Sequence, residues 1–335
     1  MRFSLLLVLF ALALASCGSR SSRRSIEPTE QEHITIERFD QDFFAVNTDS
    51  LATALPVLEK KYGSFVSLYT EDMVGLGSPY QMQFGAMMNK FVHDFAVNKA
   101  YETCQKVYPN LDELQNKLSA AFSRYHTVFP KKVIPHVLTY ISGFNQSITL
   151  TDSVLAIGLD KYLGRENKVY KELDFPRYLV YNFTPERLPV DAMRGWIMGD
   201  FPYRDSVNNL VSRMVYEGKI LYLTAQMLPN IPDSTLFGYS PEQMKWCSNN
   251  EKWMWTTLIE RKLLFSTDQF MAAKFVSEAP FTVDFSHEAP GRAAVWIGYN
   301  IVESYMQHNK NVSLAQLMAT TDEQRIFQNA KYRPQ

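Results

Sequence analysis

The side chains best suited to metal or nucleophilic chemistry in this chain are six histidines and three cysteines. No two histidines lie four residues apart, so the sequence lacks the His-Glu-x-x-His helix that binds catalytic zinc. It also lacks a Cys-x-x-Cys pair, a Gly-x-Ser-x-Gly turn that would present a nucleophilic serine, and a glycine-rich phosphate loop. We therefore expect no cofactor and no metal ion, although binding through widely scattered ligands stays an open alternative.

One cysteine does occur in a reactive context, at the end of an apolar N-terminal segment. Arg2 provides a positive charge, residues 3–13 are apolar, and LASC follows at 14–17. This is the pattern of a secretory signal, and the apolar segment is too short to span a membrane. LASC resembles the lipobox of bacterial lipoproteins, in which the thiol is acylated before cleavage. We predict a signal peptide over 1–16 and lipidation, as with palmitate, of Cys17; the alternative is an ordinary signal cleaved near Ala15.

A lipid anchor and flexible tether are predicted over residues 17–32, because the segment GSRSSRRS at 18–25 is polar and basic. Its arginines either keep the tether solvated or contact anionic lipid. Several acyl chains would hold the protein stably, since each buried methylene contributes about 0.8 kcal/mol. Gly18 rather than aspartate follows the cysteine, which resembles lipoproteins sorted to the outer membrane. We expect a lipid-anchored protein of the cell envelope, on the outer membrane and facing the periplasm.

The composition is that of a folded and nearly neutral protein. Its 335 residues are 46% hydrophobic and 13% aromatic, which is ample for a large core, and we predict a single globular domain over 33–335. The formal net charge of −1 offers no electrostatic basis for binding nucleic acid. An oxidising envelope permits a disulfide between Cys104 and Cys247, but two separate buried thiols explain these residues equally well.

Apolar residues recur at helical spacing through much of the chain. The predicted helices cover residues 51–69, 84–108, 111–129, 190–198 and 293–307. Asp205 is expected to cap a further amphipathic helix that Pro229 ends, and Ser240 to open another through a capping box. That last helix carries Trp246, Trp253 and Trp255, which either belong to the core or dock a partner.

Strand-like segments are confined to one region. Three short β-branched segments at 137–142, 147–150 and 153–159 are separated by turn residues and predict a small antiparallel sheet. Ile34 and Ile36 alternate with polar residues and predict a short strand or extended entry. The predicted fold class is therefore α+β, predominantly α-helical with one small antiparallel sheet.

Seven segments of the chain carry a further signal, namely IERFDQDFF (36–44), FPKKVIPHVLTYISG (129–143), IGLDKYLG (157–164), MVYEGKILYLTAQMLPN (214–230), GYSPEQMKWCSNNE (238–251), APFT (279–282) and SHEAPGRAAVWIGYNIVESY (286–305). Together they resemble one protein family, the gliding-motility lipoprotein B (GldB) family of Bacteroidetes. The resemblance runs in order through nearly the whole mature chain and agrees with the independent lipobox. It implies an envelope lipoprotein associated with gliding motility and its linked secretion machinery. The motifs are structural rather than catalytic.

The order of elements also resembles that of gluzincin-type metallopeptidases. In that family a small sheet precedes the helix with two zinc histidines, and a later helix supplies a glutamate. By this resemblance Asp191, Ala192 and Gly195 stand where the first histidine, the general base and the second histidine belong, and Glu217 stands on the later helix. A catalytic zinc site needs three protein ligands and an activated water, which these residues do not supply. The resemblance therefore implies a degenerate zincin-like fold.

Glu217 is the carboxylate of most interest, because it falls at the edge of an apolar helix face. It is either a boundary residue with its head in water or a residue of the former active-site cleft, paired with a basic neighbour. His287 with Glu288 forms the most site-like polar pair of the loops, although loops are polar by default. The candidate cleft residues are Asp191, Arg194, Glu217, Lys219, His287 and Arg292.

The function expected from these observations is that of a non-enzymatic scaffold or accessory factor for machinery of the gliding-motility and secretion type. The membrane, through the lipid on Cys17, and envelope proteins are its expected partners. The alternative is a lipid-anchored envelope hydrolase, peptidase-like, with a site near Glu217. A ligand-binding lipoprotein is a third possibility, for which an open apolar pocket would be the support.

Overall fold

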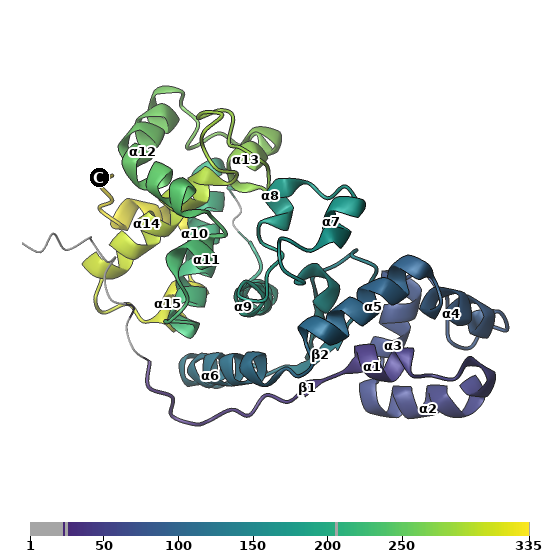
Figure 1. Cartoon of the computed structure of the whole chain (residues 1–335). Helices are drawn as coiled ribbons and strands as arrows, with labels where there is room; N and C mark the ends of the chain where they lie inside the picture. Colours follow the sequence, from purple (N-terminus) through teal and green to yellow (C-terminus); the bar gives the residue numbers. More distant parts are fainter. Residues whose placement is uncertain (1–22, 24–25, 205–206, 335) are drawn as a thin grey trace, which may run out of the picture.

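Figure 1 shows the computed structural model of the chain, in which residues 23, 26–204 and 207–334 are described. The predicted signal peptide and half of the anchor and tether predicted over 17–32, Cys17 included, lie outside the described residues, as does Asp205. Among the residues described, no helix combines the length and the apolarity needed to cross a bilayer.

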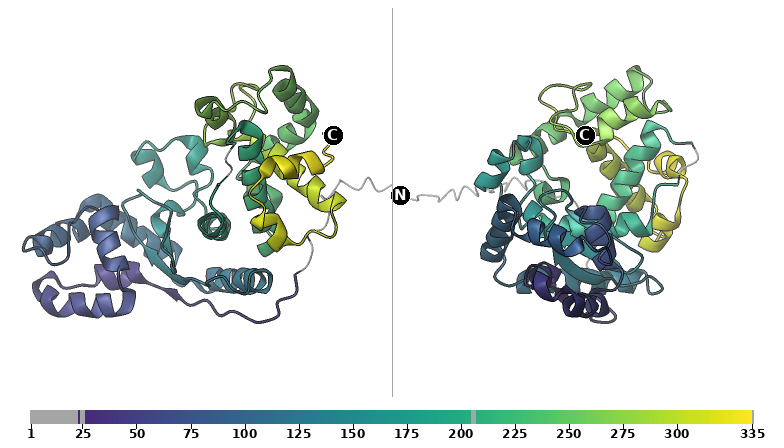
Figure 2. Two further views of the ribbon diagram at one scale, coloured as in Figure 1. Left: turned by 180° about the vertical axis from the view of Figure 1, so that it is seen from behind. Right: turned by 90° about the vertical axis from the view of Figure 1, so that its right-hand side faces the viewer.

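Short helices form a lobe at one end of the molecule, opposite the end that carries α12 and α14 (Figures 1 and 2). Its centre is a cluster of aromatic rings, in which Phe39 contacts Tyr62, Phe65 and Tyr69 with edge-to-face geometry. The elements of the lobe are α1 (Phe39–Phe44), η1 (Thr48–Ser50), α2 (Leu51–Tyr62), α3 (Phe65–Ser67), the π-helix η2 (Leu68–Met73) and α4 (Phe84–Val92); α5 (Phe95–Val107) follows.

Two predicted helices are each divided in the structure. The expectation of one helix over 51–69 is wrong because Gly63 has φ of 56° and ends α2, after which the chain continues through α3 and η2. The expectation of one helix over 84–108 is wrong because Asp94 begins a new helix. Its side chain accepts hydrogen bonds from the backbone N–H groups of Ala96 and Val97, which caps α5.

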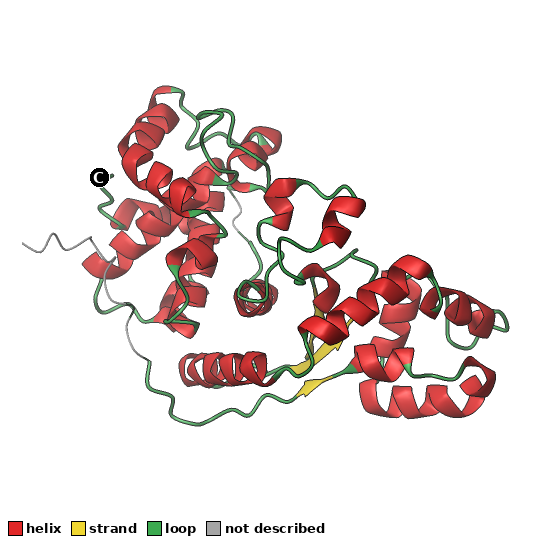
Figure 3. Cartoon of the chain, viewed as in Figure 1, coloured by secondary structure: helices red, strands yellow, loops and turns green. Residues whose placement is uncertain are grey.

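The sheet is mixed rather than antiparallel, although the predicted strands are present (Figure 3). Its four strands have the order β1-β2-β4-β3. The hairpin of β3 (Ile148–Leu150) and β4 (Val154–Gly158) is antiparallel, whereas β2 (His136–Tyr140) pairs in parallel with both β4 and β1 (Ile36–Glu37). The prediction of antiparallel pairing is therefore correct for β3 and β4, which a tight turn joins, and wrong for β2. The α+β, predominantly helical class is confirmed.

The sheet separates two hydrophobic clusters, because successive strand residues point to opposite faces. Leu138, Tyr140 and Ala156 belong to the cluster of the N-terminal lobe. Val137, Leu155 and Ile157 belong to the larger cluster of the remaining helices. The same short strands therefore provide the packing surface for both parts of the molecule.

The larger cluster is built around α10 (Leu210–Met227) and α14 (Ala293–His308), with α6 (Asp112–Val128) and α9 (Leu188–Asp200) packed beside α10. Helix α10 is buried on most of its circumference rather than amphipathic as expected. Helices α10 and α14 cross with their backbones in contact at two glycines. A Cβ atom on Gly218 would lie 2.3 Å from the carbonyl oxygen of Gly298, and one on Gly298 would lie 1.8 Å from the carbonyl oxygen of Met214.

The remaining elements surround this pair. The predicted capping box at Ser240 is confirmed, since its hydroxyl and the Gln243 side chain each bond the other's backbone N–H at the start of α12. Trp246 and Trp255 of α12 are half-buried and Trp253 is 45% exposed, while Cys104 and Cys247 are buried and are not joined by a disulfide. The elements are η3 (Leu159–Lys161), α7 (Lys168–Glu172), α8 (Arg177–Val180), α11 (Asp233–Phe237), α12 (Pro241–Glu260), α13 (Gln269–Val276), α15 (Leu314–Ala319) and α16 (Glu323–Asn329).

Candidate functional site

Glu217 lies on α10 between two arginines that come from different elements. Its carboxylate accepts a hydrogen bond from Arg194 of α9 at 2.8 Å, and the Arg292 guanidinium lies 3.8 Å away. The Glu217 side chain is only 15% exposed. Burial acts to raise the pKa of Glu217, but the charges of Arg194, Arg292 and Arg213 outweigh it and hold that pKa below its usual value. Glu217 is therefore an ionised anchor for arginines and is poorly suited to accept a proton near neutral pH.

Arg292 extends this network to a second carboxylate. The residue directly precedes α14 in the left-handed conformation, with φ of 62°, and its guanidinium donates a hydrogen bond to Glu278 at 2.8 Å. Burial acts to lower the pKa of Arg292, but Glu278 and Glu217 raise it, and the net shift is upward. The Thr282 hydroxyl accepts from the N–H of Ala293 and donates to the Pro290 carbonyl, which closes the loop before α14. Arg292 is thus held where its charge serves both carboxylates.

Asp191 lies on α9, less than one turn before Arg194, and has its own arginine. Arg187 donates a hydrogen bond to it at 2.8 Å, and the Tyr162 hydroxyl donates another at 3.1 Å. Arg187 also donates to the carbonyl oxygens of Thr235 and Leu236, so its buried guanidinium ties α9 to α11. Asp191 is consequently oriented from both sides, and its i,i+4 spacing from Arg187 is a signal that the sequence carries.

A hollow of about 260 Å³ lies between β3, α8 and α9, and Asp191 and Arg194 form part of its wall. A second hollow of about 500 Å³ adjoins it, because Asn182 and Glu278 line both. We call the two together the α9 groove. The first is lined by Ser147, Ile148, Tyr162, Leu179, Asn182, Phe183, Arg187, Asp191, Arg194, Gly195, Met198 and Glu278. The second is lined by Arg177, Tyr178, Tyr181, Asn182, Gly238, Tyr239, Ser240, Gln243, Glu278, Ala279, Pro280, Phe281, Pro290 and Gly291.

The α9 positions compared with zinc histidines are shaped by packing. Ala192 is fully buried, and a Cβ atom on Gly195 would lie 3.0 Å from the Cγ2 atom of Ile148 in β3. A longer side chain at Gly195 would have to displace the Ile148 side chain. In the described part of the chain, no group of three or more His, Cys, Asp or Glu side chains is arranged to hold a metal ion. The polar groups around Glu217 are arginines, which bind anions rather than metals.

The structure brings Asp191, Arg194, Glu217 and Arg292 together and places the other two candidates elsewhere. Lys219 lies two residues beyond Glu217, so it belongs to another face of α10, where it is buried and bonds Glu323 of α16 at 3.0 Å. His287 is exposed in the loop before α14, where its ring contacts Phe281. Tyr162 and Glu278 complete the network and were not expected. Glu278 precedes Arg292 by a long loop, a spacing with no local signal.

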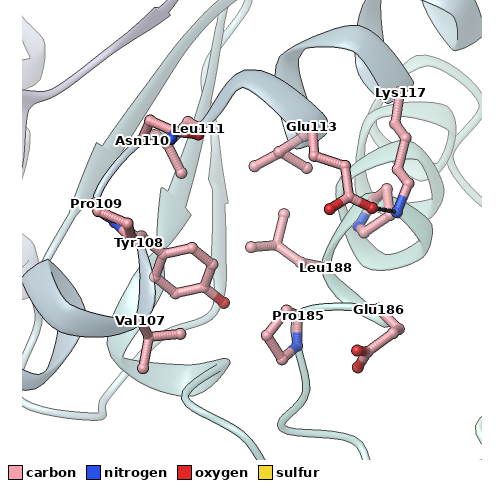
Figure 4. Close-up of a pocket in the computed structure, with 12 residues that line it drawn as sticks. Val107, Tyr108, Pro109, Asn110, Leu111, Glu113, Lys117, Pro185, Glu186 and Leu188 are labelled. Atoms are coloured by element: carbon pink, nitrogen blue, oxygen red, sulfur yellow. Dashed lines mark hydrogen bonds and ion pairs between the residues drawn. The ribbon is translucent and has the colours of Figure 1, made fainter.

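A separate hollow of about 300 Å³ lies between the α5–α6 connection and the start of α9 (Figure 4). None of the candidate cleft residues lines it. Its charged side chains include Glu113 and Lys117, which pair with each other at 2.6 Å, and the buried Tyr108 hydroxyl donates to the Tyr162 carbonyl. Glu113, Lys117 and Tyr108 are thus already engaged in hydrogen bonds or ion pairs, and the α9 groove is the stronger candidate site.

Comparison with known protein families gives a match over nearly the whole chain. The family model described as gliding motility protein GldB matches residues 20–334, which is nearly the whole chain. The curated proteins and the solved structures with which the chain was compared give no match.

Proposed function

Because the chain belongs to the GldB family of gliding motility proteins, we propose that it is a lipid-anchored cell-envelope protein that acts as a non-enzymatic scaffold or accessory factor for the motility and secretion machinery. The proposed anchor is an acylated Cys17, and the proposed location is the outer membrane, facing the periplasm. The lipobox LASC and the following Gly18 support this location.

The single observation that carries the non-enzymatic role is the pairing of Glu217. A hydrolase built on this carboxylate would need it to activate water, either as a general base or beside a metal ion. Here Arg194 and Arg292 neutralise it and Arg213 adds a further positive charge, so the carboxylate is already engaged. Positively charged arginines also oppose the approach of a divalent cation. The network stabilises the position of α9 against α10 and α14, as expected of a rigid binding body.

One contact of the tether is consistent with a body held close to the membrane. Arg23 donates hydrogen bonds to the carbonyl oxygens of Pro229 and Ile231 and forms an ion pair with Asp233. Only five residues separate Arg23 from Cys17. Because an extended chain spans at most about 3.6 Å per residue, the α10–α11 end would lie within roughly 22 Å of an acylated cysteine.

Affinity purification from membranes of the producing bacterium tests the scaffold role. Wild type and Cys17→Ala should both be expressed, and the wild type should fractionate with membranes and co-purify with specific envelope proteins, while Cys17→Ala loses both properties. Metal analysis of the purified wild type should find no stoichiometric zinc, and Glu217→Gln should retain the partners. Stoichiometric zinc together with a peptidase activity that Glu217→Gln abolishes would replace this proposal with the hydrolase alternative.

A further inference from the structure

Strand β3 presents an unpaired edge. It is the last strand of the sheet and pairs with β4 on one side only. The carbonyl oxygen of Ser147 accepts from Gly158 N–H at 2.8 Å, and Thr151 N–H donates to the Val154 carbonyl at 3.0 Å. Since alternate residues of an antiparallel strand point their backbone groups toward the partner, those of Ile148 and Leu150 point the other way.

The outward backbone groups of β3 are open to a ligand. Within the described ranges, neither Ile148 nor Leu150 has a backbone hydrogen bond on that side, and the strand is half-exposed. The side chain of Ile148 packs on α9 at Gly195, and that of Leu150 packs on Gly199, 3.2 Å from a Cβ atom placed there. The side chains are thereby fixed while the backbone edge stays free. Such an edge is a template for an added strand.

The free edge borders the first hollow of the α9 groove, and the wall of the two hollows together carries one more positive than negative side chain. The charged side chains that line the whole groove are Arg177, Arg187 and Arg194 against Asp191 and Glu278. In the described part of the chain Arg177 forms no ion pair, and Arg194 bonds Glu217 through Nη2 while its buried Nε has no partner. Because guanidinium groups bind carboxylates in bidentate fashion, this wall favours an acidic ligand.

The second hollow provides room for an apolar side chain of the same ligand. Tyr178, Tyr181 and Phe281 line it together with Pro280, and Phe281 is exposed. Aromatic walls with a few polar groups are typical of pockets that receive an anchoring side chain. The groove thus combines a backbone edge, an arginine-rich wall and an aromatic hollow in continuous order.

We propose that the α9 groove binds an extended segment of a partner protein that adds as a fifth strand beside β3, directs acidic side chains toward Arg194 and Arg177, and places an apolar side chain among the groove tyrosines. The backbone of Ile148 and Leu150 gives the affinity for an extended chain, and the arginines select for carboxylates. The inference rests on the proposed function in that the segment is bound without being cleaved.

Peptide binding to the full chain, solubilised in detergent, tests this inference. The probes are pools of fluorescent octapeptides, acetylated and amidated, with glutamate, lysine or alanine fixed at one position and measured by fluorescence anisotropy. Glutamate pools should bind roughly tenfold more tightly than lysine pools, as one well-placed ion pair would give. In the best glutamate peptide, N-methylation at alternate positions in one phase should abolish binding, while methylation in the other phase should preserve it.

Arginine variants test whether the preference for glutamate peptides comes from the groove or from the overall charge of the protein. Arg194→Gln and Arg177→Gln should each remove most of the preference for glutamate, whereas Arg325→Gln, at an exposed position of α16, should keep it. Arg177→Gln keeps the test decisive if the Arg194 variant is unstable, because Arg177 is exposed and unpaired among the described residues. Equal binding of glutamate and lysine pools, equal effects of both methylation phases, or an equal loss in Arg325→Gln would overturn the inference. Cleavage of a bound peptide, detected by mass spectrometry, would overturn the non-enzymatic function but leave the groove's selectivity standing.

Discussion

Helix α10 carries two ion pairs, Glu217 with Arg194 and Lys219 with Glu323. Only one residue lies between Glu217 and Lys219 in the sequence, but their side chains leave the helix on different faces. Glu217 faces α9 and the start of α14, where Arg194 and Arg292 share its carboxylate and its side chain is 15% exposed. Of these two arginines, Arg194 also lines the α9 groove. Lys219 faces the interior, where it bonds Glu323 and the Thr320 carbonyl and both charged side chains are at most 4% exposed. The first pair has spare arginine charge beside a hollow, whereas the second is sealed. We infer from this comparison that the charged residues on one face of α10 are available for ligand binding, whereas those on the other face stabilise the fold.

Breaking the sealed pair should have the largest effect. Lys219→Ala leaves the buried carboxylate of Glu323 without its ammonium partner, and loss of one member of a buried pair costs about 3–5 kcal/mol. Urea unfolding followed by circular dichroism measures this loss. The double variant Lys219→Met with Glu323→Leu should recover much of the stability, since it removes both charges. A loss below about 1 kcal/mol in Lys219→Ala would contradict the sealed character of the pair.

Neutralising the Glu217 carboxylate should lower the free energy of unfolding by less. Glu217→Gln removes the counter-charge of Arg194, but Arg292 keeps Glu278 at 2.8 Å. We expect a loss of about 1.5–3 kcal/mol, which is typical of a hydrogen bond to a charged group. The loss should fall as pH is lowered, because the depressed pKa of Glu217 contributes stability above the unfolded-state pKa and loses it as pH drops through the folded-state value. A loss as large as that of Lys219→Ala would remove the distinction between the two faces.

A third carboxylate sharpens the comparison because its pKa moves in the opposite direction. Asp160 is buried, pairs with no arginine among the described residues, and accepts hydrogen bonds from the backbone N–H groups of Ser142 and Phe144. Burial raises its pKa from 3.8 to about 6, although those two bonds act to lower it. The ionised form is thus disfavoured on folding, and stability is lost as pH rises from about 4 to 6.

Asp160→Asn should remove that pH dependence. Relative to wild type, the variant should gain about 2–3 kcal/mol between pH 4 and pH 7, which corresponds to a shift of about two pKa units at 1.36 kcal/mol each. Urea midpoints collected across this pH range measure the difference. If the difference in unfolding free energy between the variant and wild type is the same at pH 4 and at pH 7, burial does not raise the pKa of Asp160 in the folded protein.

The smallest effect is expected at the exposed end of the groove. Arg177→Gln should change stability by no more than about 0.5 kcal/mol, because the side chain is exposed and has no ion pair in the described part of the chain. The same unfolding measurement, made beside the peptide assay, would then assign any loss of binding to recognition. A large destabilisation would show that Arg177 stabilises the fold, and a loss of binding in this variant could then not be assigned to a lost ligand contact.

Local signals in the sequence predicted local structure well. The capping box at Ser240, the hairpin turn at Thr151 and Asp152 and the last long helix are all present, since each depends on neighbouring residues. The parallel pairing of β1 with β2 was not predictable in the same way, because Ile36 pairs with Val137 through backbone groups that carry no side-chain signature.

The candidate site was predictable in part for the same reason. Periodicity placed Asp191 and Arg194 on one helix and Glu217 on another, and the packing of α9 against α10 brings them together. The partners Glu278 and Tyr162 depend on how distant loops return to the groove, which no spacing encodes. The different environments of Lys219 and Glu217 were not predictable, because α10 is buried on most of its circumference and lacks the usual contrast between a polar and an apolar face.

The glycine crossing of α10 and α14 has a consequence for motion. With carbonyl oxygens and glycine Cα atoms in contact at Gly218 and Gly298, the two helices have no side-chain layer that could repack, so they are expected to slide or rotate only as one body. Glu217 is carried by one helix and Arg292 precedes the other, so their separation should be invariant. Since α8, α9 and β3 line the groove, any change in its width is expected to come from these elements, and Arg194 is the contact that joins α9 to the fixed pair of helices.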